Sequence, residues 1–190
     1  MKRCIVISIL LSLVVSAGGI EELDRSVYDA IHSGWKCDFA DAYFGASSSV
    51  GNTEVHLSVN LGLLCFGNEK MRESAKLATV GLAASMLTAQ ILKCIVGRER
   101  PEDNDVPRCQ SSFPSGHATA AFTSAYVFSS QYPRLTIPLY VLATSIAISR
   151  IYLGKHYPSD VIAGAAIGTA AGFVVMKNKN FVLSIGVMEN

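Results

Sequence analysis

Residues 161–176 read VIAGAAIGTAAGFVVM and contain no Asp, Glu, Lys or Arg. A helix formed by this segment is apolar on every side, so it has no stripe that faces water. Gly164, Gly168 and Gly172 repeat at GxxxG spacing, which places them on one helix face and allows a neighbouring backbone to approach closely in lipid. In water, each mid-helix glycine would cost about 1 kcal/mol relative to alanine. The segment therefore predicts a membrane helix that packs through its glycines.

Three further segments, 77–92, 118–133 and 135–149, also lack charged side chains, and four such helices cannot all be central in a chain of 190 residues. Short polar turns separate the longer apolar segments, which cover residues 55–67, 77–96, 117–132, 135–150 and 160–176, with turns at 68–76, 97–116, 133–134 and 156–158. The pattern predicts an all-α fold: a single helical bundle, namely a six-helix integral-membrane bundle with an interfacial helix after the first span.

The N-terminal residues allow two interpretations. Lys2 and Arg3 precede an apolar run that ends in small residues, as in a signal peptide, but about 17 apolar residues also reach the lower limit for a membrane span. We therefore divide the chain into residues 1–20, a first membrane helix or a signal peptide, and residues 21–190, a single helical-bundle domain.

An amphipathic helix is expected next. The apolar residues recur at helical spacing and the acidic residues fall between them: Ile20, Leu23, Val27 and Ile31 on one face, and Glu21, Glu22, Asp24 and Asp29 on the other. Trp35, Tyr43 and Phe44 follow in a segment that suits a membrane interface, although an ordinary surface helix explains them equally well.

The composition agrees with a membrane protein. Hydrophobic residues make up 50% of the chain, which excludes disorder. Charged residues make up 16%, whereas soluble domains average roughly 25%. The net charge of +1 without a basic arm excludes a nucleic-acid partner. If the segments alternate across a bilayer, the short basic loops share one side, which should be cytoplasmic: Lys2, Arg3, Lys70, Arg72, Lys76, Arg134, Lys177 and Lys179.

Basic residues on the opposite side gather around three loops, as an exception to that charge rule. The loops carry three polar clusters: Lys93 with Arg100-Pro101; Pro114-Ser115-Gly116-His117 at the start of an apolar helix; and Ser149-Arg150 with His156 and Asp160. Lys93, Arg100 and Arg150 supply cations that match the oxygens of a phosphoryl group. Ser115 and Gly116 precede a helix N-terminus, where free N–H groups favour an anion. The clusters predict a site for a phosphate-like oxyanion.

Two histidines and one carboxylate add reactive groups to this site. A carboxylate near a histidine fixes its tautomer and raises its basicity, so His156, Asp160 and His117 suggest a nucleophile, an orienting group and a general acid. A metal held by the same three side chains is the main chemical rival, but three adjacent cations would repel a divalent ion.

Together the clusters resemble the signature of the type 2 phosphatidic acid phosphatase superfamily, K-x6-R-P, P-S-G-H and S-R-x5-H-x3-D, with all eleven fixed residues in order between residues 93 and 160. The resemblance implies that His156 forms a phosphohistidine, that Asp160 orients it, and that His117 protonates the leaving group. It implies that the oxyanion cradle consists of Lys93, Arg100, Ser115, Gly116 and Arg150. It also implies no metal and no other cofactor, and a six-helix bundle with the site on the non-cytosolic face.

The resemblance leaves several functions open. The first is an integral-membrane phosphatase acting on a lipid phosphate or diphosphate, such as phosphatidic acid, phosphatidylglycerol phosphate, undecaprenyl pyrophosphate or lipid A, in a bacterial inner membrane with the site facing the periplasm or exterior. The alternatives are a secreted soluble acid phosphatase, a vanadium-dependent haloperoxidase and a non-enzymatic membrane scaffold. The oligomeric state is left open.

The cysteines show neither a CxxC pair nor metal-ligand spacing. We expect mostly buried free thiols, since free cysteine is often buried. A disulfide between Cys37 and Cys109 is considered only if both face an oxidising compartment.

Overall fold

The computed structural model describes residues 19–103 and 105–184, and every regular element in them is a helix. The predicted all-α class is confirmed. The prediction for residues 1–20 falls, apart from its last two residues, outside the described part. The elements are a helix through residues 19–32, α2 (Asp38–Val50), α3 (Thr53–Phe66), α4 (Glu69–Val96), η1 (Arg108–Gln110), α5 (Gly116–Gln131), η2 (Pro133–Leu135), α6 (Thr136–Tyr152), α7 (Pro158–Lys177) and α8 (Lys179–Ser184).

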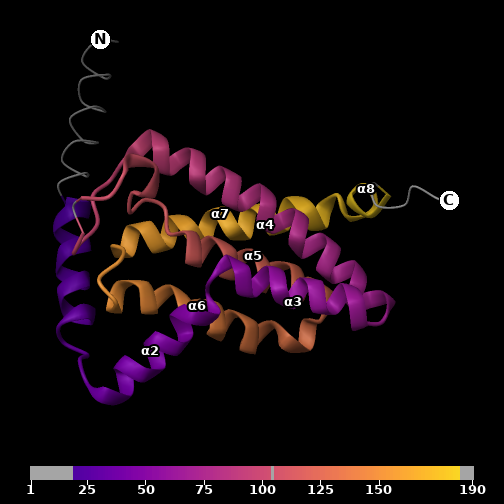
Figure 1. Ribbon diagram of the computed structural model, residues 1–190, viewed down its shortest axis with the longest axis horizontal. Helices are drawn as coiled ribbons and strands as arrows, with labels where there is room; N and C mark the ends of the chain where they lie inside the picture. The colour runs from indigo at the N-terminus through magenta and orange to yellow at the C-terminus, as the bar shows by residue number, and fades with distance from the viewer. Residues whose placement is uncertain (1–18, 104, 185–190) are drawn as a thin grey trace, which may run out of the picture.

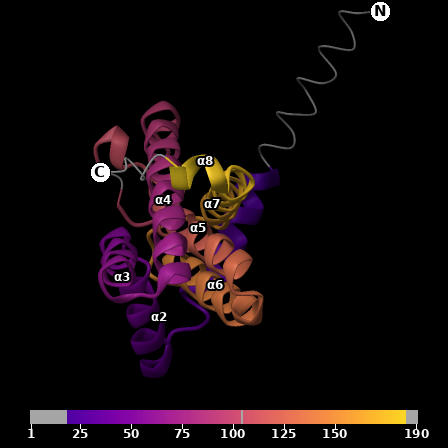
Figure 2. The same cartoon turned by 90° about the vertical axis from the view of Figure 1, so that its right-hand side faces the viewer.

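Helix α5 forms the centre of the bundle. It packs against α3, α4, α6 and α7, which surround it in two perpendicular views (Figures 1 and 2). Most of its buried side chains are small, including Ala118, Ala120, Ala121 and Ala125. Small residues allow four helices to approach one central helix. The helix through residues 19–32 lies across one end of this bundle (Figure 1).

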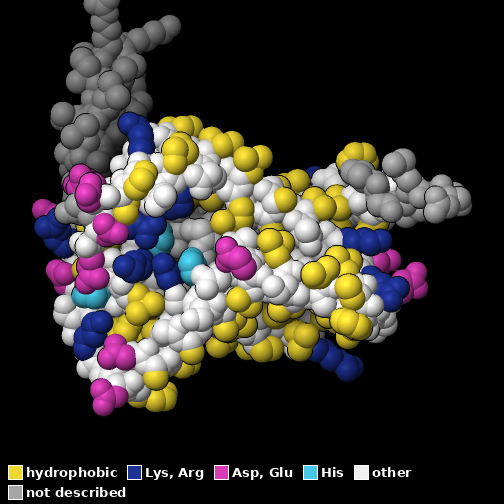
Figure 3. Space-filling model, viewed as in Figure 1, with side chains coloured by type: hydrophobic (Ala, Val, Ile, Leu, Met, Phe, Trp, Pro, Cys, Tyr) yellow, Lys and Arg dark blue, Asp and Glu magenta, His cyan; other side chains and the backbone are white. Residues whose placement is uncertain are grey.

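In the described part of the chain, three stretches are long and apolar enough to cross a membrane: Glu69–Val96, Pro133–Tyr152 and Pro158–Lys177. The 20 residues of α7 span about 30 Å, the thickness of a bilayer's hydrocarbon core. Large apolar side chains point outward from all three, for example Leu87, Ile137 and Ile162, which are 63%, 78% and 69% exposed. Hydrophobic groups cover the middle of the bundle, whereas charged groups lie mainly at its two ends (Figure 3). The apolar belt is that of a membrane protein.

The α5–α7 contact depends on the glycines predicted to face a neighbour. A Cβ added to Gly164 would lie 2.5 Å from the carbonyl oxygen of Ser115, and one added to Gly172 would lie 2.8 Å from Cβ of Tyr126. At Gly168 the added Cβ would run into the carbonyl oxygen of Thr119. The two backbones are therefore too close for any side chain at these positions.

We predict that Gly168→Ala lowers the thermal stability of the detergent-solubilised protein. The two helices must separate to admit the methyl group, and overpacking of this kind costs about 1–3 kcal/mol. At roughly 2–4 °C per kcal/mol, Tm should fall by about 2–12 °C. Gly62→Ala in α3 is the matched control, because no atom lies within 4 Å of its added Cβ. If Gly168→Ala melts as high as Gly62→Ala, the close α5–α7 approach is wrong.

The segment 68–76 does not form the predicted polar turn. Helix α4 begins at Glu69, and the side chain of Asn68 caps it by accepting a hydrogen bond from the N–H of Met71, at 3.0 Å. Ser74 and Ala75 are buried while the charged side chains of these turns lie outside, so two amphipathic turns continue into the apolar helix.

The predicted helix near residues 20–31 is present, and Glu21, Glu22 and Asp29 are exposed as expected of its polar face, but Asp24 is not. Ile20 and Leu23 are 53% and 64% exposed, whereas Asp24 is only 4% exposed. Tyr28, one turn beyond Asp24, is also buried. The face of this helix that packs against the bundle thus carries the carboxylate of Asp24, which pairs there with Arg98 from a distant loop.

Candidate active site

The predicted site residues meet at one end of the bundle, where α4 and α6 end and where α5 and α7 begin. Lys93 lies in the last turn of α4, and Arg150 in the last turn of α6. Ser115 is the N-cap residue of α5, and Asp160 lies in the first turn of α7. Antiparallel packing of these helices brings together residues that are up to 67 positions apart. Figure 3 shows histidine and basic side chains gathered at this end.

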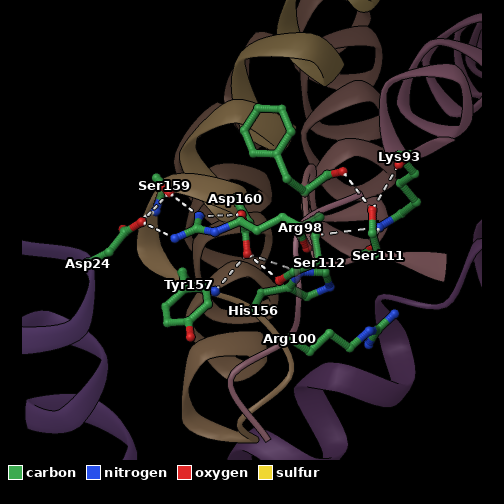
Figure 4. Close-up of polar contacts among 12 residues, drawn as sticks. Asp24, Lys93, Arg98, Arg100, Ser111, Ser112, His156, Tyr157, Ser159 and Asp160 are labelled. Carbon is green, nitrogen blue, oxygen red and sulfur yellow. Dashed lines mark hydrogen bonds and ion pairs between the residues drawn. The ribbon is translucent and has the colours of Figure 1, made fainter. Parts of the chain in front are cut away.

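His156 lies in the short link between α6 and α7 and is only 3% exposed. Its Nδ1 is 3.7 Å from Oδ2 of Asp160, which is within ion-pair distance but longer than a hydrogen bond. The hydroxyl of Ser112 lies beside both groups: it donates to Oδ2 of Asp160 and is 3.4 Å from Nδ1 of His156. Ser112 and Asp160 thus contact the Nδ1 side of the ring and orient it, which leaves Nε2 as the nitrogen that can react (Figure 4).

Burial keeps His156 neutral. It lowers the pKa of His156 to about 4; Asp160 opposes this shift, and the positive charges of Lys93 and Arg150 add to it. Because the lowered pKa lies well below 7, the imidazole is unprotonated at neutral pH. A neutral ring is the form that can act as a nucleophile.

Asp160 is fully buried and is surrounded by donors. Oδ1 accepts a hydrogen bond from Nη1 of Arg98 at 2.8 Å, and Oδ2 accepts one from the N–H of Tyr157 at 2.8 Å in addition to the Ser112 bond. These donors satisfy the carboxylate and stabilise its charged form.

The three predicted cations of the cradle donate hydrogen bonds to uncharged groups. Lys93 Nζ donates to the carbonyl oxygens of Ser111 and Ser112, at 2.5 and 3.4 Å, and Arg100 donates to the carbonyl oxygen of Gln110. Arg150 Nη1 donates to the hydroxyl of Ser48 in α2, while its buried Nε has no partner. Within residues 19–103 and 105–184, none of the three cations forms an ion pair with a carboxylate. Their positive charge remains available for an anion.

The start of α5 offers further donors. The hydroxyl of Ser115 is buried, has no partner among the described residues and makes no cap bond to its own helix. Its N–H donates to the carbonyl oxygen of Asp160 at 3.0 Å, which links α5 to α7. The following N–H groups of α5, beginning with Gly116, have no carbonyl one turn earlier in the helix to bond with. Such a terminus attracts an oxyanion.

His117 lies in the first turn of α5 and is half-buried. Burial, and after it the positive charges of Arg150 and Arg100, lowers the pKa of His117 to about 3, so its ring is neutral at pH 7 when no anion is bound. Gly51, which joins α2 to α3, leaves room for its ring, since a Cβ there would be 3.0 Å from Cδ2 of His117. All eight predicted site residues thus lie at the same end of the bundle.

Four polar residues at this end were not predicted as site residues: Asp24, Arg98, Ser112 and Ser159. Arg98 lies between Lys93 and Arg100 but is not one of the residues of the signature. It contacts carboxylates that are 62 and 74 residues away in the chain, and no local pattern reveals such pairs.

A disulfide joins Cys94 at the end of α4 to Cys109 in η1. The considered Cys37–Cys109 pairing is therefore wrong. The expectation of mostly buried free thiols also fails, since Cys37 and Cys65 are exposed. Arg108 explains the contact: its guanidinium donates to the carbonyl oxygens of Cys94 and Ile95, at 2.8 and 2.7 Å, and so holds η1 against the C-terminus of α4.

Within the described residues there is no group of three His, Cys, Asp or Glu side chains arranged to hold a metal ion. The donors at the site are mainly cationic and N–H groups, whose chemistry fits an oxyanion and not a divalent cation.

More than half of the chain resembles known proteins in sequence. Residues 75–182 match the family model of the PAP2 superfamily. The chain is 38% identical over 112 residues to decaprenylphosphoryl-5-phosphoribose phosphatase of Mycobacterium tuberculosis, with 56% of this chain and 62% of that protein covered. It is 36% identical over 95 residues to lipid A 1-phosphatase of Rhizobium etli, with 44% of this chain and 41% of that protein covered. The match thus spans less than two thirds of these curated relatives.

Two crystal structures share the fold. LpxE of Aquifex aeolicus superposes with a TM-score of 0.71 at 27% identity, covering 82% of this chain and 95% of that one. The transmembrane PAP2 type phosphatidylglycerolphosphate phosphatase of Bacillus subtilis superposes with a TM-score of 0.67 at 22% identity, covering 95% of this chain and 96% of that one.

Proposed function

The chain belongs to the PAP2 superfamily, and on that premise we propose that it is a phosphatase that hydrolyses the phosphate monoester or diphosphate of a membrane lipid. The names of its relatives support a lipid-linked substrate: decaprenylphosphoryl-5-phosphoribose phosphatase, lipid A 1-phosphatase and undecaprenyl-diphosphatase are all lipid phosphatases. Residues 21–190 would form its one catalytic domain.

One observation carries the proposal: buried His156 lies at the same end of the bundle as three cations, and within the described residues none of these cations pairs with a carboxylate. A phosphoryl group would supply the missing negative charge, and Arg100, Arg150 and Lys93 would bind its non-bridging oxygens. The hydroxyl of Ser115 and the free N–H groups at Gly116 would complete this cradle.

In the first chemical step, Nε2 of His156 attacks phosphorus, and the bond between phosphorus and the lipid oxygen breaks. The negative charge of the bound phosphoryl group offsets the nearby cations and raises the pKa of His117, so that His117 binds a proton. His117 gives this proton to the leaving oxygen, so the lipid leaves as an alcohol, or as a phosphate when the substrate is a diphosphate. Asp160 remains ionised and stabilises the positive charge that develops on the phosphorylated ring. The enzyme is left as a phosphohistidine.

In the second step, water attacks the phosphohistidine and the N–P bond breaks. His117, now unprotonated, takes a proton from the water, and inorganic phosphate leaves with the regenerated imidazole behind it. The chain's own groups supply each proton and charge in this cycle, so we propose that no metal ion is required.

The outer surface favours a membrane enzyme over a secreted soluble acid phosphatase, because large apolar side chains are exposed along α4, α6 and α7. We further propose that the site faces the periplasm or exterior. The Cys94–Cys109 disulfide at this end suits an oxidising compartment, and short basic segments, including those with Lys70, Arg134 and Lys177, lie at the helix ends away from the site.

We predict that the purified protein in detergent releases phosphate from lipid phosphates and continues to do so with excess EDTA. The panel consists of phosphatidic acid, phosphatidylglycerol phosphate, undecaprenyl pyrophosphate, lipid A and decaprenylphosphoryl-5-phosphoribose, with glycerol 3-phosphate as the control without a lipid tail. Vanadate, which adopts the geometry of the transferring phosphoryl group, should inhibit. Loss of activity in EDTA would contradict the metal-free mechanism, and inactivity on every lipid would contradict the proposed function.

The haloperoxidase alternative makes the opposite prediction. It requires bromide oxidation with vanadate bound and no phosphate release without it. The panel experiment therefore separates the two functions in one preparation.

A further inference from the structure

Asp24 is a buried carboxylate that the proposed reaction does not use. It lies on the helix through residues 19–32, before the part of the chain that matches the family model, and is 4% exposed. Oδ1 accepts a hydrogen bond from the N–H of Ser159 at 2.8 Å, and Oδ2 accepts bonds from the Ser159 hydroxyl and from Nη2 of Arg98, the latter at 2.8 Å. A carboxylate held by three donors can remain charged although buried.

Arg98 connects this carboxylate to the active site. One arm of its guanidinium, Nη2, bonds to Asp24, and the other, Nη1, bonds to Asp160 Oδ1 at 2.8 Å and to the Ser159 hydroxyl at 2.7 Å. The plane of the group lies over the ring of Tyr157, with Cζ 4.2 Å from the ring centre. Figure 4 shows Arg98 between Asp24 and Asp160, with His156 on the far side of Asp160.

The guanidinium is therefore held at both ends and on one face. Its fixed fork places Oδ1 of Asp160, and this determines where Oδ2 lies relative to Ser112 and to Nδ1 of His156. If Asp24 lost its charge, Nη2 would lose its ionic partner and Arg98 could rotate. The carboxylate of Asp160, and the His156 ring that it orients, would then be held less firmly in place.

We propose that Asp24 is a positioning residue for phosphoryl transfer, acting through Arg98 on Asp160 and so on the orientation of His156. The N-terminal helix is then part of the catalytic apparatus, although it contributes no residue of the family signature. This inference rests on the proposed function for its kinetic consequences but not for its structural ones.

A second polar contact of the same helix provides the matched control. His32 Nδ1 is 2.8 Å from the carbonyl oxygen of Tyr152, and its Nε2 is 2.7 Å from Oε1 of Glu102. These bonds also hold the helix against the bundle but touch none of the groups proposed to react. His32→Gln should therefore show how kcat responds when this helix is held less firmly against the bundle but the contacts of Asp24 are intact.

We predict that Asp24→Asn lowers kcat by about 10- to 100-fold with KM within about twofold of wild type, since a shift of about 1 Å in a reacting group costs about a hundredfold. His32→Gln should leave kcat within about twofold. In an Arg98→Lys background, Asp24→Asn should reduce kcat by a smaller factor than in the wild type, because its effect passes through Arg98. Ser159→Ala, which leaves both Arg98 ion pairs in place, provides a milder test if Asp24→Asn does not fold, with an expected loss of several-fold in kcat.

A readout that needs no activity separates this inference from the proposed function. The ¹⁵N NMR signals of His156, in protein labelled at histidine, should shift in Asp24→Asn but not in His32→Gln. If the wild type hydrolyses no lipid phosphate while this shift is present, the proposed function fails and the positioning role stands. If Asp24→Asn moves neither the His156 signals nor kcat relative to His32→Gln, the inference is wrong.

Discussion

His156→Ala is expected to abolish the release of phosphate from every lipid substrate. In the proposed mechanism the imidazole of His156 is the nucleophile, and its Nε2 is the atom that bonds to phosphorus. Removal of the nucleophile from a covalent mechanism costs roughly 10³-fold or more in kcat. The measurement is phosphate release by the purified variant at saturating substrate.

Two control variants distinguish loss of the nucleophile from other effects of a histidine substitution. His156→Gln keeps a polar side chain near Ser112 and Asp160 and should be equally inactive, because an amide nitrogen is not a nucleophile. His32→Gln, a histidine substitution outside the site, should remain active. A His156→Ala protein that turns over at the wild-type rate would refute the assignment of the nucleophile.

His117→Ala is expected to slow hydrolysis by a factor that depends on the leaving group. A general acid contributes about 10²- to 10⁴-fold when the leaving oxygen needs a proton, so kcat for a lipid monoester should fall by that factor. The leaving group of para-nitrophenyl phosphate is para-nitrophenolate, which is stable without a proton. For this substrate, kcat should therefore fall by a much smaller factor. The comparison of kcat for these two substrates, in the variant and in the wild type, measures the role directly.

His117 and His156 lie on different segments of the chain. His117 is in the first turn of α5, in the space left by Gly51, and His156 is in the link between α6 and α7. If both substrates lost activity by the same factor, His117 would be a binding or structural residue and not the acid.

Most of the helices could be predicted because their signals are local, and so could the eight candidate site residues that the fold brings to one end of the bundle. An apolar segment such as 161–176 can be recognised from its own residues, and each of the three motif blocks is short. The glycine repeat even indicated which face of α7 packs closely, and α5 meets it there. Local patterns suffice wherever a property repeats along the chain.

The Asp24–Arg98–Asp160 network could not be predicted in this way. Asp24 was placed on the polar face because a carboxylate usually faces water, and only the tertiary partner Arg98 makes its burial favourable. The Cys94–Cys109 disulfide was missed for the same reason. Cys94 lies in an apolar helix, and nothing in its neighbourhood shows that η1 folds back onto it.

The central claim is that phosphate passes through His156, and a trapping experiment tests it most directly. Wild-type protein is mixed with a lipid phosphate labelled with ³²P, quenched in alkali after milliseconds, digested and mapped. We predict alkali-stable, acid-labile label on the peptide that contains His156, and no label in His156→Ala. Steady release of labelled phosphate with no label on that peptide at any quench time, or label on a different residue, would contradict the mechanism.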